Sequence, residues 1–115
     1  MSDNKIRSIF VYKSYFTDFL KKLNNQKVKD KIFYVLRIIE NIQMVSKDYL
    51  KHIEGTDGLY EIRVQSGSDI YRIFCFFDEG KLVVLANGFQ KKTQKTPKKE
   101  IDKALKIKSE YESEK

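Results

Sequence analysis

The sequence predicts an α+β fold whose elements follow the order β-α-α-β-β-β-α. Two patterns indicate this class. Between residues 14 and 39, apolar side chains recur at the three- and four-residue spacing of amphipathic helices. Between residues 59 and 89, three β-rich runs are separated by short turns that contain glycine, which is typical of an antiparallel meander.

The length and composition restrict the kind of protein. The 115 residues suit one domain, so we expect a single domain over residues 1–115. The longest apolar run, Ile73–Phe77, is far shorter than the roughly 20 residues that span a bilayer, and no signal-peptide core is evident. We therefore expect a cytoplasmic protein without a membrane partner. The one cysteine, Cys75, lies in this run and is expected to be a buried thiol in a reducing compartment.

The N-terminal part is predicted to form a strand and two helices. The β-rich run Ile9–Tyr12 is expected to be a partly buried strand. One helix follows Ser14 and another follows the turn at Asn24-Asn25, so the two are expected to form an antiparallel hairpin. Residues 44–58 lose clear periodicity and are predicted to be a connecting loop. The apolar stripes of the helices are Phe16, Phe19, Leu20 and Leu23, then Val28, Ile32, Val35, Leu36 and Ile39.

Three strands and a final helix complete the expected fold. The run Leu59–Gln65 alternates like a half-exposed strand, whereas Asp69–Phe77 and Lys81–Phe89 are apolar on both faces. Both faces of these last two strands must therefore be covered. The helical hairpin can cover one face, and a C-terminal helix capped by Thr96, with Pro97 at its first position, can cover the other. Its apolar stripe is Ile101, Ala104, Leu105 and Tyr111.

Positive charge is concentrated near the C-terminus. The formal net charge of the chain is +7, and residues 91–108 hold eight lysines against Glu100 and Asp102, a local charge of +6. Clustered cations attract a polyanion and release its counterions, which indicates a nucleic acid as partner. The alternative is a solvated surface whose lysines only keep the protein soluble. This lysine-rich run alone favours neither the nucleic-acid partner nor the solvated surface.

Two arginines in the predicted strands favour an anion site. Arg63 and Arg72 each lie in the middle of a strand, where an unpaired guanidinium is costly unless it lines a cleft. If the hairpin closes between them, they become neighbours able to bind one phosphate. The alternative is that Glu61 pairs with one or both. The single histidine, His52, has no neighbours at metal-ligand spacing and no nucleotide-binding motif is present, so no metal or cofactor is expected.

Three stretches carry a family resemblance. Leu59–Arg63 (LYEIR), Tyr71–Ile73 (YRI) and Asn87–Pro97 (NGFQKKTQKTP) resemble the HigB-like, phage-related branch of the RelE/ParE toxin superfamily, and the match extends in order over most of the chain. The resemblance implies a small curved antiparallel sheet with packed helices. It also implies a toxin of a type II toxin-antitoxin system, a ribosome-dependent endoribonuclease that cuts messenger RNA and pairs with a helix-turn-helix antitoxin.

The implied reaction assigns roles to individual residues. Metal-free RNA cleavage needs a base for the 2′-hydroxyl, cations for the phosphate and an acid for the leaving oxygen. We assign Arg63 and Arg72 to the phosphate and Lys91 or Lys92 to proton transfer, with Glu61 as a second candidate base. Several related toxins carry a histidine in the segment before the Gly-Phe-Lys-Lys type motif, a region in which this chain has Asn87. Asn87 cannot exchange protons near neutral pH, so either the lysines carry the acid-base role or catalysis is slow. Further candidate RNA contacts are Lys51, Lys95, Lys98, Lys99 and Phe89, the last of which is more simply a core residue.

The resemblance leaves other functions open. A ParE-like inhibitor of DNA gyrase shares the fold but needs no RNA-cleaving groups. A degenerate member would bind its antitoxin and have no toxic activity. For neutralisation, the antitoxin is expected to cover either the Lys91–Lys99 face or an apolar groove beside the helices.

Overall fold

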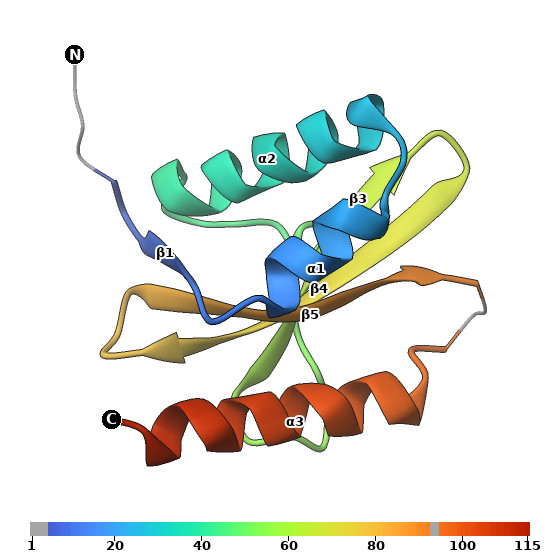
Figure 1. Cartoon of the computed structure of the whole chain (residues 1–115). Coiled ribbons are helices and arrows are strands. Elements are labelled where there is room, and N and C mark those ends of the chain that lie inside the picture. Colours follow the sequence, from blue (N-terminus) through green and yellow to red (C-terminus); the bar gives the residue numbers. More distant parts are fainter. Residues whose placement is uncertain (1–4, 93–94) are drawn as a thin grey trace.

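The structure is a computed structural model that describes residues 5–92 and 95–115. It has one five-stranded sheet between two layers of helix (Figure 1). Helices α1 and α2 cover one face and α3 covers the other, so the predicted α+β class is confirmed. The elements are β1 (Ser8–Val11), α1 (Tyr15–Lys22), α2 (Gln26–Asn41), β2 (Leu50–His52), β3 (Leu59–Ser66), β4 (Asp69–Asp78), β5 (Leu82–Lys91) and α3 (Lys98–Ser113).

The strands lie in the order β1-β5-β4-β3-β2. The antiparallel meander predicted for residues 59–89 is confirmed, since β4 pairs antiparallel with both β3 and β5. The sheet as a whole is mixed, because β1 joins the far edge parallel to β5 with Ser8 opposite Leu82. The prediction of a loop over residues 44–58 is wrong at β2, which pairs antiparallel with β3. This strand is short and contains the polar Lys51 and His52, so no alternation marks it in the sequence.

The sheet buries apolar side chains on both faces, as β4 and β5 require. Along β4, Ile73 and Cys75 belong to the core shared with α1 and α2, whereas Phe74 and Phe76 belong to the core shared with α3. Burial raises the pKa of the Cys75 thiol, as expected for a structural cysteine. The strand predicted from Ile9 is more exposed than expected, because β1 lies at the sheet edge and Phe10 is 44% exposed.

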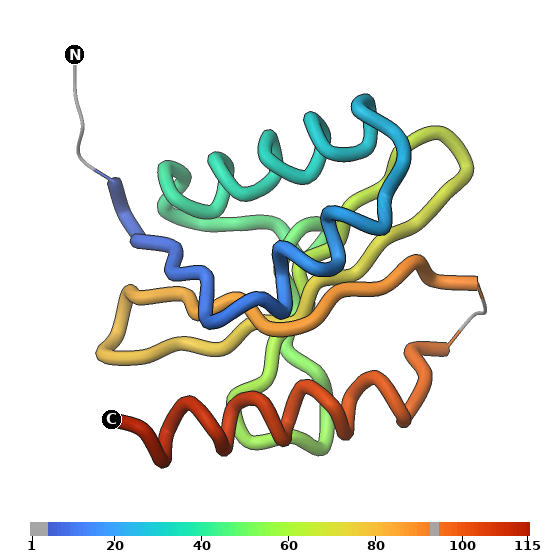
Figure 2. Tube along the Cα trace, viewed as in Figure 1, coloured from blue at the N-terminus to red at the C-terminus, as the bar shows by residue number. Residues whose placement is uncertain are grey.

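After β5 the chain returns as α3, which runs along the face of the sheet opposite to α1 and α2 (Figure 2). The predicted start of this helix is wrong by one residue. Pro97 is the N-cap, Lys98 is the first helical residue, and the hydroxyl of Thr96 donates to Glu61 instead of capping the helix. The predicted apolar stripe is confirmed and extended, since Ala104 and Ile107 are buried against the sheet.

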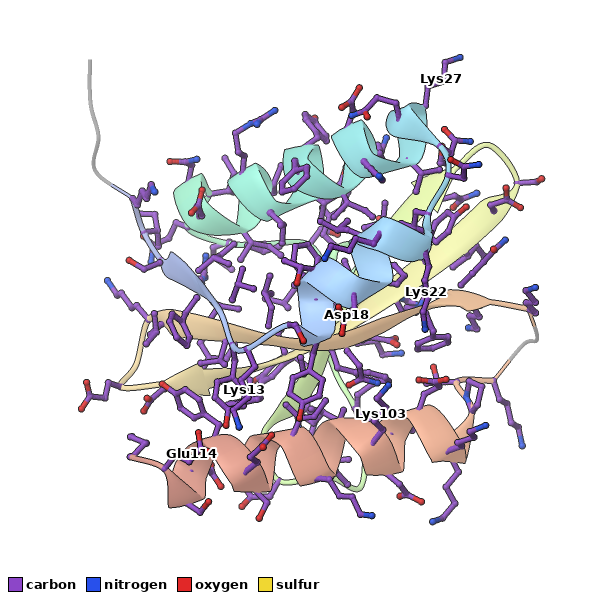
Figure 3. The ribbon with its side chains drawn as sticks, in the orientation of Figure 1. Lys13, Asp18, Lys22, Lys27, Lys103 and Glu114 are labelled. Atoms are coloured by element: carbon purple, nitrogen blue, oxygen red, sulfur yellow. The ribbon has the colours of Figure 1, made fainter. Side chains whose placement is uncertain are left out.

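The other end of α3 is tied to the start of the chain by polar contacts. Tyr12 donates to Glu114 at 2.6 Å and Tyr15 donates to Glu110 at 2.7 Å. Figure 3 shows Lys13 beside Glu114, and its ammonium lies within 3.1 Å of the Glu114 carboxylate. These contacts hold the C-terminal end of α3 against the residues at the junction of β1 and α1.

A close contact explains the glycine in the Asn87-Gly88-Phe89 segment. A Cβ atom at Gly88 would lie 2.7 Å from the ring of Phe19, which is closer than two carbon atoms can approach. Glycine therefore lets α1 pack directly on β5 at this point. The packing fixes the strand just before its polar end at Lys91.

Candidate functional site

The hairpin of β3 and β4 brings two arginines together. In the register of these strands, Arg63 lies directly opposite Arg72, so the prediction that they are neighbours is confirmed. Like charges at this position repel each other, and burial adds to the cost. A counter-charge is therefore required close by.

Glu61 supplies this counter-charge from the same strand. Its carboxylate lies 3.5 Å from Nε of Arg63 and 3.4 Å from Nε of Arg72. The alternative that Glu61 pairs with one or both arginines is thus confirmed for both. The half-exposed alternation predicted for β3 is wrong at this residue, because Glu61 is only 5% exposed. A strand's alternation shows which residues share a face but not whether a distant segment covers that face.

The guanidinium groups keep part of their donor capacity. Arg72 is 5% exposed, its Nη1 donates to the carbonyl of Tyr71, and its buried Nε has no hydrogen-bond partner among the described residues. Arg63 is half-buried and its Nη1 donates to the carbonyl of Lys47. Within the described part of the chain, the Nη2 groups of both arginines make no hydrogen bond. Two donor groups are therefore available side by side.

Lys91 adds a third cation from β5. Its pKa is lowered from the ordinary lysine value, first by burial and then by the charge of Arg72, with smaller effects of Arg63 and Lys51 in the same direction. Glu61 acts in the opposite direction. Lys51, Arg63, Arg72 and Lys91 thus come from four adjacent strands and surround one carboxylate, and we call these five residues the cationic cluster.

Two polar contacts join the region of the cluster to the start of α3. Thr96 donates its hydroxyl to Glu61 at 3.4 Å. Asn87 is 2% exposed, and its amide nitrogen donates to both the carbonyl and the carboxylate of Glu100 at 3.3 Å. The Oδ1 atom of Asn87 is buried without a hydrogen-bond partner among the described residues. Sequence reasoning assigned neither Thr96 nor Glu100 to the site, because no local pattern reports a contact between segments this far apart.

The remaining predicted residues lie around this cluster or apart from it. Lys92, Lys95 and Lys99 are exposed on the segment that joins β5 to α3 and on the first turn of α3. Lys98 pairs with Asp102 at 2.9 Å on the exposed side of α3. Phe89 stacks on Phe74 with ring centres 5.6 Å apart and belongs to the core beneath α3. Thr93 and Gln94 of the family-like segment lie outside the described residues.

His52 takes part in local contacts. Its Nε2 lies 3.1 Å from the carbonyl oxygen of Thr56, and its ring meets that of Tyr60 edge to face.

Among residues 5–92 and 95–115, no group of three or more His, Cys, Asp or Glu side chains is arranged to hold a metal ion. None of the helices described is long and apolar enough to cross a bilayer.

The layered α+β fold, with three helices on a five-stranded mixed sheet, is compatible with a small RelE-like fold. The chain belongs to the phage-derived Gp49-like family, because residues 18–109 match the family model described as "Phage derived protein Gp49-like (DUF891)". This is a family of RelE-type, toxin-like proteins related to toxin-antitoxin systems. No curated protein gives a significant match to the chain.

The buried position of Glu61 predicts a large effect on stability. Glu61→Gln removes the counter-charge of a buried guanidinium, so the free energy of unfolding should fall by about 3 kcal/mol. Asp102→Asn is the matched control, because it breaks the exposed pair with Lys98 and should cost less than about 1 kcal/mol. Urea denaturation measures both. Equal and small losses in the free energy of unfolding of the two variants would show that Glu61 does not stabilise the arginines.

The neighbours of Lys91 predict how its pKa responds to mutation. Arg72→Met removes a positive charge that lowers the pKa of Lys91, so that pKa should rise. Arg37→Met is the control, because it removes an exposed positive charge on α2 and should leave the pKa of Lys91 unchanged. The pKa is read from an NMR titration of the lysine side-chain carbon resonances. A fall in the pKa, or no change, in Arg72→Met would contradict the proposed coupling.

Proposed function

We propose that this protein is the toxin of a type II toxin-antitoxin system, of the HigB-like branch, and that it cleaves ribosome-bound messenger RNA in the cytoplasm. Membership of the toxin-like Gp49 family supports the toxin role. The observation that carries the reaction type is the cationic cluster, in which four positive side chains surround the single carboxylate of Glu61. Such an excess of clustered positive charge favours binding of an RNA phosphate.

The arginines are suited to hold the phosphate. Glu61 engages the Nε edges of Arg63 and Arg72, which leaves the Nη2 groups to donate to two oxygens of one phosphodiester. In this arrangement Glu61 positions the arginines rather than acting as the base. Its carboxylate is buried and already committed to two guanidinium groups and to Thr96. The arginines then stabilise the charge that develops on the phosphate in the transition state.

Lysine provides the proton transfer in this proposal. The 2′-hydroxyl oxygen attacks the adjacent phosphorus and the bond from phosphorus to the 5′-oxygen breaks, giving a 2′,3′-cyclic phosphate and a 5′-hydroxyl. The proton that the 2′-hydroxyl loses to a base is balanced by the proton that the 5′-oxygen gains from an acid. Lys91 is the first candidate for one of these roles because its pKa is lowered. Lys92 is the second candidate, while Asn87 cannot exchange protons near neutral pH.

A dependence on the ribosome fits the geometry of this cluster. Glu61 and Arg72 are each only 5% exposed, so a phosphate must arrive in one narrow range of orientations. Free RNA samples many backbone conformations, and holding the reacting groups in one geometry removes a large entropic barrier. A messenger held in the decoding site is already ordered in this way.

The proposed function is tested by expressing the chain alone under a tight promoter. We expect growth arrest with new 5′ ends inside translated codons, and we expect Arg72→Ala and Lys91→Ala to lower cleavage at least 100-fold because each removes a cluster cation. Lys27→Ala is the control, since it removes the same charge from an exposed side chain at the start of α2 that points away from the sheet and is not part of the cluster (Figure 3). Mapping of messenger 5′ ends measures the outcome. Arrest with intact messages would favour a gyrase inhibitor, and no arrest would indicate an inactive member.

We infer that the antitoxin, a helix-turn-helix protein, docks on the apolar groove between β1 and α2. This groove has a volume of about 220 Å³, and its lining includes Val11 and Phe33, which are 39% and 43% exposed. Large apolar side chains left open in this way are typical of surfaces that a partner covers. In this proposal the antitoxin does not cover the alternative surface, Lys91–Lys99.

Substitutions can distinguish the apolar groove from the Lys91–Lys99 surface as the docking site of the antitoxin. Phe33→Lys places a charge in the groove and should weaken antitoxin binding at least tenfold, because a buried aromatic contact is lost. Lys99→Ala, on the alternative surface, should leave binding unchanged. Calorimetry with a co-expressed helix-turn-helix partner measures both variants. The reverse result, a loss of antitoxin binding only in Lys99→Ala, would show that the antitoxin docks on the Lys91–Lys99 surface instead.

A further inference from the structure

A cavity of about 540 Å³ opens beside the cationic cluster. Its lining comes from the hairpin of β3 and β4, from the residues just before β2 and from α2. Arg63 and Arg72 contribute to its lining, so the cavity and the proposed phosphate site share two residues. The other lining residues are Lys31, Asp48, Tyr49, Val64, Gln65 and Ile70.

The walls of the cavity combine apolar and polar groups as small-molecule sites do. Tyr49 and Ile70 are half-buried and contribute flat and branched apolar surface to the lining. Pockets of 300–1,000 Å³ hold a small ligand, which gives room for a nucleobase with its sugar. An aromatic side chain beside a nucleic-acid phosphate is the usual platform for a stacked base. The cavity therefore fits one base of the RNA whose phosphate is held by the arginines.

One carboxylate stands out in this otherwise positive lining. Asp48 is the acidic residue among the lining residues, and within the described part of the chain its carboxylate makes no hydrogen bond or ion pair. Lys31, which also lines the cavity, lies on α2 and is exposed. The Lys31 ammonium lies over the ring of Tyr34, 5.6 Å from its centroid, a weak contact at an exposed site that leaves its N–H donors without a hydrogen-bond acceptor among the described residues. The Asp48 carboxylate and the Lys31 ammonium can therefore contact the same ligand.

We propose that this cavity binds guanine, and that Asp48 determines this specificity. Guanine presents two adjacent donors, N1–H and the N2 amino group, which a carboxylate accepts together. Its O6 and N7 acceptors suit a cation such as Lys31. Adenine, cytosine and uracil each place an acceptor beside their donor at this edge, so each loses one bond to the carboxylate. The placement of this base next to a phosphate in RNA rests on the proposed function, whereas recognition of guanine by the cavity does not.

Binding of mononucleotides to the purified full chain tests the inference without any cleavage. The probes are the 3′-monophosphates of guanosine, adenosine, cytidine and uridine, because each carries a base beside a phosphate. We expect guanosine 3′-monophosphate to bind about tenfold more tightly than the other three, with NMR shift changes at Tyr49 and Gln65. Equal affinities for all four nucleotides would overturn the proposal.

Two variants separate specificity from general charge effects. Asp48→Asn should abolish the preference for guanosine while keeping the weaker binding of the other nucleotides, because the phosphate site is untouched. Asp30→Asn is the matched control, since Asp30 is exposed on α2, accepts from Gln26 and does not line the cavity. Thermal unfolding confirms that both variants are folded. A preference that persists in Asp48→Asn would overturn the assignment of Asp48.

The outcomes distinguish this inference from the proposed function. Selective binding of guanosine 3′-monophosphate by a protein that cleaves no message would refute the nuclease and keep the guanine site. Cleavage at codons with no enrichment of guanine, together with equal nucleotide binding, would keep the nuclease and refute the guanine site. Where both hold, Asp48→Asn should also remove guanine enrichment beside the mapped cleavage positions.

Discussion

One buried carboxylate makes the cationic end of the sheet possible. The register of β3 and β4 places Arg63 directly opposite Arg72, an arrangement that repels and that burial makes worse. Glu61 lies two residues before Arg63, on the same side of the strand, and reaches both guanidinium groups. Without this counter-charge, the pairing of the two strands would carry an uncompensated buried cation.

The same carboxylate connects the sheet to the helix on its far side. Thr96 donates to Glu61 just before α3 begins, and Asn87 in the middle of β5 donates to Glu100 in the first turn of α3. The start of α3 is therefore fixed by the contact of Thr96 with Glu61 and by the contact of Asn87 with Glu100, rather than by a side-chain cap of its own. This explains why Thr96, which has the right chemistry for an N-cap, does not serve as one.

The sequence predicts the parts of this structure that depend on local pattern. The helical stripes and the meander are visible as periodicity, and the short turn at Gly67-Ser68 fixes the register that brings Arg63 and Arg72 together. The strand β2, the parallel pairing of β1 and the burial of Glu61 could not be predicted in this way. Each depends on a segment distant in sequence, and no local spacing records such contacts.

Charge and shape have different roles at this site. In the proposed function, four cations around a single carboxylate leave the cluster positive after a phosphodiester binds, so the substrate need not displace Glu61. Attraction of this kind acts on every phosphate of a nucleic acid and carries no information about sequence. Discrimination between substrates must come from groups that contact a base edge. In this structure the free carboxylate of Asp48, in the cavity that shares both arginines with the cluster, is the group whose position and chemistry meet that requirement.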